Sequence, residues 1–164
     1  MARAFIGLGS NLGDRRANLE RALALVGASE GVTLGAVSSF IETDPVGGPP
    51  QGRFLNAAAE LQTTLEPRAV LAALLDVERR MGRLRRERWG PRVIDLDLLL
   101  YEDRIVDDED LVLPHPGMHR RRFVLAPLAE IASEAVHPRL AKTVAELLAE
   151  TGTRNPQPGR WNRR

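Results

Sequence analysis

The sequence predicts an α+β protein with a ferredoxin-like βαββαβ core, in which two helices pack on one face of an antiparallel sheet and a C-terminal helical extension follows. The first observation is the order of the segments, since strand-like and helix-like patterns alternate as β-α-β-β-α-β. The second is the length of 164 residues without an internal repeat, which fits one core. The third is a composition of 43% apolar and 27% charged residues, which is typical of soluble globular proteins.

The first part of the chain supplies a strand, a helix and a second strand. Residues 3–9, RAFIGLG, mix apolar and small side chains as short strands do. After the turn SNLGD, leucine and alanine at helical spacing predict an amphipathic helix over 14–28. β-branched residues predict the second strand over 32–43, and the density of glycine and proline in 44–53 predicts a loop.

The next segments complete the core. Alternating side chains predict a third strand over 54–64, and a helix is expected from Pro67 to Gly82. The arginine-rich segment 83–92 is expected to be a polar loop, and VIDLDLLLY (93–101) is the fourth strand.

The remaining residues form the extension. A turn leads from the fourth strand to a short partner strand at 105–106, and an irregular stretch follows. Apolar spacing predicts two shorter helices over 123–132 and 143–151. The segment from about 154 to 164 is expected to be a loose basic tail, so we predict a single domain that spans residues 1–164.

The fourth strand carries two aspartates, which are unusual in an apolar run. Because side chains alternate along a strand, Asp95 and Asp97 point to one face and Leu96 to the other, with the two aspartates about 7 Å apart. Two such carboxylates repel each other unless a cation lies between them, and Mg²⁺ suits this arrangement. The motif alone leaves open a second possibility, namely two exposed aspartates that pair with arginine.

Several arginines precede these aspartates in the sequence. The segment 83–92 contains five of them: Arg83, Arg85, Arg86, Arg88 and Arg92. Guanidinium groups bind phosphate oxygens in a bidentate manner. An acid pair beside an arginine-rich loop therefore indicates a polyphosphate site, although an exposed helix end and loop would also account for some of these residues.

Other residues could contribute to a ligand site. Trp89 lies in a Gly/Pro loop, where it either anchors the loop to the core or stacks on a planar ligand. His115 lies in the motif PHP, whereas we expect His137 to be structural. The glycines of GLGSNLG (7–13) lack the spacing of a dinucleotide site, and no P-loop motif occurs, so we expect them to let a strand-to-helix turn approach the site closely.

Composition argues against several classes of partner. A net charge of +1 argues against a nucleic-acid partner. No apolar run of about 18 residues is present, so we expect no membrane span. The chain shows no signal-peptide pattern and contains no cysteine, and we therefore expect a cytoplasmic protein.

Four blocks of the sequence together resemble one known family. They are FIGLGSNLGD near the start, FLNAA (54–58), GRLRRERWGPRVIDLDLLLY (82–101) and LPHPGMHRRRFVLAPLAEIA (113–132). The chain resembles the 6-hydroxymethyl-7,8-dihydropterin pyrophosphokinase family, up to about residue 150. The resemblance implies a ferredoxin-like monomer that transfers pyrophosphate from ATP to the pterin hydroxymethyl group, with release of AMP, in folate biosynthesis.

The resemblance also implies roles for individual residues. Asp95 and Asp97 would hold two Mg²⁺ ions on the ATP phosphates, with Arg83, Arg85 and Arg92 as further catalytic residues. The nucleotide would contact Glu78, Arg83, Arg85, Trp89, Arg92, His115 and Arg121. The pterin would contact Thr43, Val46, Phe54, Asn56, Trp89 and Phe123, with Trp89 and Phe123 on either side of the ring. Asp110 lies where some members have a basic residue.

Three other functions would use parts of the same sequence. RNA-binding proteins with a ferredoxin-like sheet display aromatic side chains on central strands, but aromatics make up 4% of this chain. A metal-dependent phosphodiesterase or nucleotidyltransferase would use the same acid pair. A family member without activity would be an interaction module, which the presence of Asp95, Asp97, Arg92 and His115 argues against.

Overall fold

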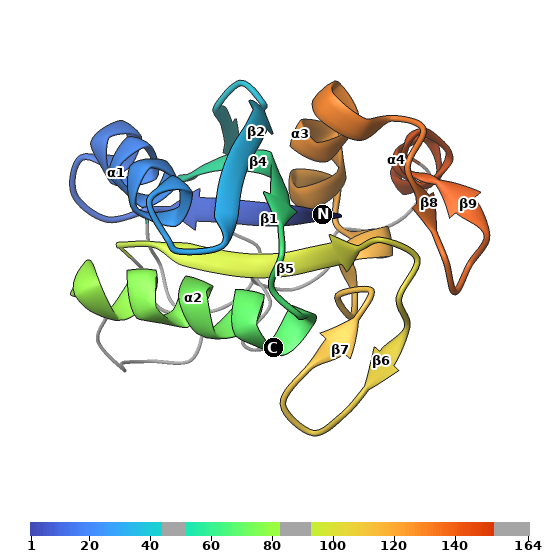
Figure 1. Cartoon of the computed structure of the whole chain (residues 1–164). Coiled ribbons are helices and arrows are strands. Elements are labelled where there is room, and N and C mark those ends of the chain that lie inside the picture. Colours follow the sequence, from blue (N-terminus) through green and yellow to red (C-terminus); the bar gives the residue numbers. More distant parts are fainter. Residues whose placement is uncertain (44–51, 83–92, 153–164) are drawn as a thin grey trace.

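An antiparallel sheet of five strands forms the centre of the fold. The computed structural model describes residues 1–43, 52–82 and 93–152 (Figure 1). The strands are β1 (Ala2–Ser10), β2 (Val32–Val37), β3 (Ile41–Thr43), β4 (Phe54–Thr63) and β5 (Asp95–Tyr101). Their order is β2-β4-β1-β5, and β3 also pairs with β4. With its two crossover helices, this arrangement confirms the predicted ferredoxin-like core.

Two helices cover one face of this sheet, namely α1 (Arg15–Gly27) and α2 (Pro67–Arg80). α1 begins where Asp14 Oδ1 accepts the N–H of Ala17 at 3.1 Å, which satisfies one of the amides left open at a helix start. α2 begins with a proline and ends before Gly82, whose φ of +82° suits the residue after a helix. Buried apolar side chains of both helices and of β1, β4 and β5 form the larger hydrophobic core here.

The C-terminal extension covers part of the opposite face. α3 (Arg122–Ala132) packs on this face through a second cluster of buried apolar side chains, and α4 (Val144–Thr151) packs on α3. A capping box between Thr143 and Glu146 begins α4. Both helices predicted for the extension are therefore confirmed.

The single strand predicted over 32–43 is wrong, because the structure divides it into β2 and β3. Ser38 Oγ accepts the N–H of Ala58 at 2.9 Å, so a side chain replaces a main-chain acceptor of the sheet. The N–H and hydroxyl of Ser39 donate to the two carboxylate oxygens of Glu130 on α3, at 2.8 and 2.7 Å. These polar contacts interrupt the strand and hold α3 against the sheet.

The short partner strand predicted at 105–106 is also wrong. β6 (Val106–Asp107) pairs with β7 (Val112–Leu113) and forms a separate hairpin (Figure 1). Strands of two residues are too short to show alternation, which is why the sequence pattern missed them. A second small pair, β8 (Val136–His137) and β9 (Lys142–Thr143), precedes α4.

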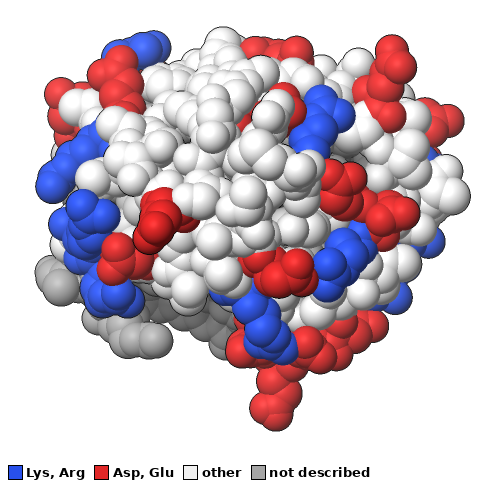
Figure 2. Space-filling model, viewed as in Figure 1, with Lys and Arg blue, Asp and Glu red and all other residues white. Residues whose placement is uncertain are grey.

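Charged side chains of both signs occur over the face shown in Figure 2, which agrees with the net charge of +1. Within the three described ranges, no helix combines the length and the apolar character that crossing a bilayer requires. The tail predicted over 154–164 lies outside the described residues. The division of the chain into one domain stays a prediction.

His137 in β8 links the stability of the fold to pH. Burial, and secondly the charge of nearby His119, lower the pKa of His137 to about 4, and its Nδ1 accepts the N–H of Leu140 at 3.2 Å. The unfolded chain takes up this proton near pH 6.5, whereas the folded chain does so only near pH 4, so acid favours unfolding. We expect His137 to lower the free energy of unfolding by roughly 1–3 kcal/mol between about pH 7 and pH 4.5.

Denaturant unfolding at several pH values measures this effect. His137→Asn keeps an acceptor for the Leu140 amide but does not titrate, so its stability should depend less steeply on pH. The same dependence in both proteins would show that other groups cause the acid sensitivity.

Candidate active site

Asp95 and Asp97 lie on the face of β5 that is opposite α1 and α2. Leu96 between them packs into the core under these helices, as the alternation of a strand predicts. The aspartates are 6% and 1% exposed, so the alternative of two exposed aspartates is wrong. Two carboxylates on one face of a strand offer oxygen atoms of the kind that bind a divalent cation.

A glycine of β1 lies directly opposite each aspartate. Gly9 pairs with Asp95, and Gly7 pairs with Asp97. Paired residues point to the same face, so β1 places no side chain beside either carboxylate. The expectation that these glycines form a strand-to-helix turn is wrong for Gly7 and Gly9, whereas Gly13 does lie in the turn, with a φ of +72°. A Cβ at Gly7 would lie 3.5 Å from the side chain of Leu99, so Leu99 packs over Gly7, and β1 contributes only main chain to the floor beside Asp95, at Gly9.

An irregularity in the strand pairing bounds the site at one end. The register between β1 and β5 shifts between Phe5 and Ile6, and both Leu99 and Leu100 join the core under α3. A bulge of this kind places two consecutive residues on one face. Buried leucines therefore follow Asp97 along the strand on its own face.

β3 and β4 bring three of the predicted pterin residues to the same face. Asn56 pairs with Gly9, which in turn pairs with Asp95, so Asn56 lies two strands from the carboxylate, about 10 Å away. Asn56 is 2% exposed, and its Nδ2 donates to Thr43 Oγ1 at 2.5 Å. Thr43 pairs with Phe54, which is also buried.

His115 lies beside Asp97 at the outer edge of β5. The His115 N–H donates to the carbonyl oxygen of Leu99 at 2.9 Å, which fixes this segment along the strand. Its Nε2 lies 3.6 Å from Asp97 Oδ1, and both side chains are buried. Gly117 follows with a φ of +88°, and a Cβ there would lie 3.4 Å from Arg121 Nε. The absence of a side chain at Gly117 thus lets the guanidinium of Arg121 pack on the turn after His115.

Glu78 reaches β5 from α2. Its side chain is 2% exposed, and Oε2 accepts the N–H of Leu96 at 2.7 Å. Leu96 lies between the two aspartates, so this hydrogen bond connects α2 to the main chain that carries them.

The two aspartates fit a cation that a bound ligand helps to hold. Over the described part of the chain, no group of three or more His, Cys, Asp or Glu side chains is placed to hold a metal ion. Mg²⁺ is commonly bound by one or two carboxylates and takes its other ligands from water and substrate phosphates. Asp95 and Asp97 are donors of that type.

The other predicted site residues fall into two groups. Phe123 lies in the first turn of α3 and packs, partly buried, against the second core cluster. The remaining ones lie outside the described residues: Val46, Arg83, Arg85, Trp89 and Arg92.

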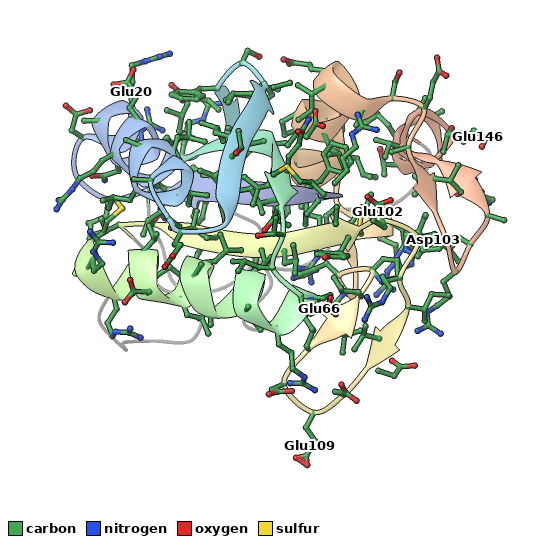
Figure 3. All side chains as sticks on the ribbon, viewed as in Figure 1. Glu20, Glu66, Glu102, Asp103, Glu109 and Glu146 are labelled. Atoms are coloured by element: carbon green, nitrogen blue, oxygen red, sulfur yellow. The ribbon has the colours of Figure 1, made fainter. Side chains whose placement is uncertain are left out.

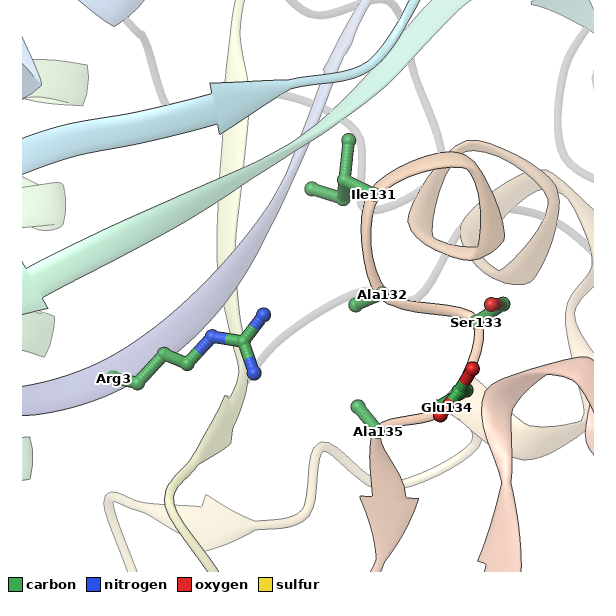
Figure 4. A pocket seen from close by; sticks show the side chains of 6 residues that line it. All are labelled: Arg3, Ile131, Ala132, Ser133, Glu134 and Ala135. Atoms are coloured by element: carbon green, nitrogen blue, oxygen red, sulfur yellow. The ribbon is translucent and has the colours of Figure 1, made fainter.

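Two cavities lie at the other end of β1. One has a volume of about 310 Å³ and is lined by Arg3, Ile131, Ala132, Ser133, Glu134 and Ala135 (Figure 4). A second, of about 360 Å³, shares Arg3 and extends to Phe5 and Leu100. Arg3 precedes Gly9 by six residues, which corresponds to about 20 Å along a strand. These cavities therefore do not belong to the candidate site.

Acidic side chains elsewhere occupy exposed turns. Glu102 and Asp103 follow β5, and Glu109 lies at the tip of the β6–β7 hairpin (Figure 3). In the same hairpin, Asp110 accepts a hydrogen bond from Arg68 at 2.6 Å, which lowers the pKa of this carboxyl group. Asp110 thus forms a surface ion pair with the start of α2.

Solved structures with a similar fold are known. A crystal structure of Plasmodium falciparum HPPK-DHPS with pteroate matches with a TM-score of 0.75 over 91% of this chain and 44% of that longer chain. A structure of HPPK-DHPS in complex with substrates matches with a TM-score of 0.74, over 91% of this chain and 43% of that one. Both are 12% identical in sequence, so they support the fold alone.

Other known proteins share much more of the sequence than these solved structures do. The profile of 7,8-dihydro-6-hydroxymethylpterin-pyrophosphokinase matches residues 5–133. The 2-amino-4-hydroxy-6-hydroxymethyldihydropteridine pyrophosphokinase of Bacillus subtilis is 49% identical, over 80% of this chain and 78% of the relative. The protein of the same name from Methylorubrum extorquens is 47% identical, over 92% and 94% of the two chains. The chain therefore belongs to the 7,8-dihydro-6-hydroxymethylpterin-pyrophosphokinase (HPPK) family.

Proposed function

We propose that this protein transfers the pyrophosphate group of ATP to the hydroxymethyl group of 6-hydroxymethyl-7,8-dihydropterin, with release of AMP, in folate biosynthesis. The main structural support is the buried pair Asp95 and Asp97, which faces glycine and has Asn56 about 10 Å away on the same face. This arrangement combines a cation site with a hydrogen-bonding site for a second substrate. Membership of the family supports the reaction itself.

We propose that the ATP phosphates bind beside Asp95 and Asp97, and that these two carboxylates would hold two Mg²⁺ ions there. When bound, Mg²⁺ neutralises phosphate charge and orients the reacting group. The proposed catalytic set also contains Arg83, Arg85 and Arg92, whose guanidinium groups would bind phosphate oxygens. Further proposed nucleotide contacts are Glu78, Trp89, His115 and Arg121.

The pterin is assigned to the part of this face formed by β3 and β4. The amide of Asn56 offers both a donor and an acceptor, which suits the polar edge of a pterin. Because Asn56 is buried, its hydrogen bonds discriminate strongly between ligands that satisfy them and ligands that do not. The proposed pterin contacts are Thr43, Val46, Phe54, Asn56, Trp89 and Phe123.

The proposed reaction is a substitution at the β-phosphorus of ATP. The pterin hydroxyl oxygen forms a bond to this phosphorus, the bond from the phosphorus to the oxygen of the α-phosphate breaks, AMP leaves, and the hydroxyl proton is released. Transition states of phosphoryl transfer are loose, so the protein contributes mainly by positioning the substrates and stabilising charge. A strong general base is not required.

Phosphorus NMR of the purified protein with ATP, MgCl₂ and 6-hydroxymethyl-7,8-dihydropterin tests this function. We expect AMP and a pterin diphosphate to form in equal amounts. Formation of ADP, or of AMP and free pyrophosphate with unchanged pterin, would contradict the proposed reaction. The expectations of a cytoplasmic monomer that binds no nucleic acid stay predictions.

A further inference from the structure

The strand that carries the two aspartates is an edge strand of the main sheet. β5 pairs with β1 on one side, where Asp95 faces Gly9 and Asp97 faces Gly7. Neighbouring residues of a strand direct their N–H groups to opposite edges, so the N–H of Leu96 points away from β1. A buried N–H needs an acceptor, because leaving it unpaired costs free energy.

Glu78 provides this acceptor from α2. The distance from Leu96 N to Glu78 Oε2 is 2.7 Å, within the range of hydrogen bonds that involve a charged group. α2 packs on the face of the sheet that is opposite the two aspartates. The carboxylate of Glu78 therefore meets the main chain of β5 at its edge and does not join the aspartates on their own face.

A second contact supports the same edge. The His115 N–H donates to the carbonyl oxygen of Leu99 at 2.9 Å, at the point where the pairing between β1 and β5 becomes irregular. Hydrogen bonds at Leu96 and Leu99 thus lie on either side of Asp97 along the strand. The main chain around Asp97 is therefore held from the outer edge on both sides, and the contact at Leu99 lies where the ladder to β1 becomes irregular.

We propose that Glu78 is a positioning residue for the cation site. Through the N–H of Leu96 it fixes the main chain between Asp95 and Asp97, and so sets the spacing of the two carboxylates toward a cation and the ATP phosphates. This inference rests on the proposed function and goes beyond the direct nucleotide contact assigned to Glu78 above.

Two conservative variants separate the hydrogen bond from the charge. Glu78→Gln loses the charge but keeps an oxygen that can accept from Leu96, whereas Glu78→Asp keeps the charge but is one methylene shorter and should not reach. Asp76→Asn is the matched control, because Asp76 is a half-exposed acid on the same helix and pairs with Arg79 at 2.6 Å. Circular dichroism checks the fold, and Glu78→Met is used where Glu78→Asp does not fold.

Three measurements follow for each variant. Amide hydrogen exchange of Leu96 in the metal-free protein reports the hydrogen bond directly. Electron paramagnetic resonance of Mn²⁺ in the presence of ATP reports metal affinity without turnover. Steady-state kinetics give kcat, the KM for ATP and the Mg²⁺ concentration for half-maximal rate.

We expect Asp76→Asn to resemble the wild type. Glu78→Gln is expected to keep the protection of Leu96 and the metal affinity of the wild type, whatever it loses as a direct nucleotide contact. Glu78→Asp is expected to lose protection at Leu96 and to weaken metal affinity by roughly 10- to 100-fold, with a fall in kcat that follows from it, as is typical of residues that orient metal ligands. The proposal is overturned if Glu78→Gln and Glu78→Asp raise the KM for ATP equally while metal binding is unchanged. It is also overturned if Leu96 loses protection in Glu78→Asp without any change in Mn²⁺ binding.

The Mn²⁺ measurement also separates this inference from the proposed function. Suppose that the wild type does not transfer pyrophosphate to the pterin. Weaker Mn²⁺ binding in Glu78→Asp than in the wild type and in Glu78→Gln would still support the positioning role. Equal Mn²⁺ binding in Glu78→Asp and the wild type would refute it.

Discussion

Asp97→Ala is expected to reduce turnover by at least about a hundredfold while the protein remains folded. Asp97 is buried on the face where the cation is proposed, and its removal leaves Asp95 alone to hold the metal and the phosphate charge. Removing one of two buried like charges also relieves repulsion. The loss of the contact with His115 opposes this gain, so the free energy of unfolding should change by no more than about 1 kcal/mol. Steady-state kinetics and urea unfolding measure the two effects.

Asp103→Ala is the control for this experiment, because Asp103 is an exposed acid on the turn after β5. It should change neither activity nor stability. Unchanged Mg²⁺-dependent turnover in Asp97→Ala would remove the metal role from this residue. A large loss of stability in Asp97→Ala would instead indicate that its contact with His115 is structural.

Asn56→Leu is expected to weaken pterin binding by roughly 10- to 100-fold and to change ATP binding little. Asn56 is buried and bonded to Thr43, so leucine would leave the polar edge of the pterin and the Thr43 hydroxyl without their partner. Leucine has the same number of side-chain heavy atoms as asparagine and the same branching at Cγ, which limits the change in packing. Isothermal titration with the pterin, in the presence of a non-hydrolysable ATP analogue, measures this effect.

Gln62→Leu on the same strand serves as the comparison, since Gln62 is exposed at the far end of β4. It should bind the pterin as the wild type does. Equal pterin affinity in Asn56→Leu would exclude Asn56 from the pterin site. An equal loss of affinity for both substrates would indicate a general distortion of the sheet.

Elements with a long and regular pattern could be predicted from the sequence. α2 shows apolar residues at helical spacing between a proline and a glycine, and these local signals determine its limits. The opposite faces of Leu96 and the two aspartates follow from the alternation of a strand. For the same reason, the position of Asp95 and Asp97 on one face needed no tertiary information.

Features that depend on partners distant in the sequence could not be predicted. The break between β2 and β3 results from hydrogen bonds of Ser38 to Ala58 and of Ser39 to Glu130. The contact between Glu78 and Leu96 requires knowing how α2 lies along the edge of β5. Such contacts depend on strand register and helix packing, which the secondary-structure preferences of individual residues do not determine.

The glycines opposite the aspartates left a weak signal in the sequence. Gly7 and Gly9 have the same spacing as Asp95 and Asp97, which is the spacing of residues on one face of a strand. Only the observed register of β1 against β5 shows that the two pairs face each other. The spacing alone also fits a turn, and that interpretation was the wrong one.

The main-chain floor beside Asp95 has a consequence for inhibitors and for the evolution of resistance. A compound that rests on β1 at Gly9 would touch peptide groups, whose chemistry does not change when residues are replaced. Any substitution at Gly9 adds bulk, and that bulk would hinder the natural substrates as well. Mutations that confer resistance to such a compound would therefore have to change side chains around the floor, such as Thr43 or Phe123. Resistance should be rarest against compounds that make little contact with those side chains.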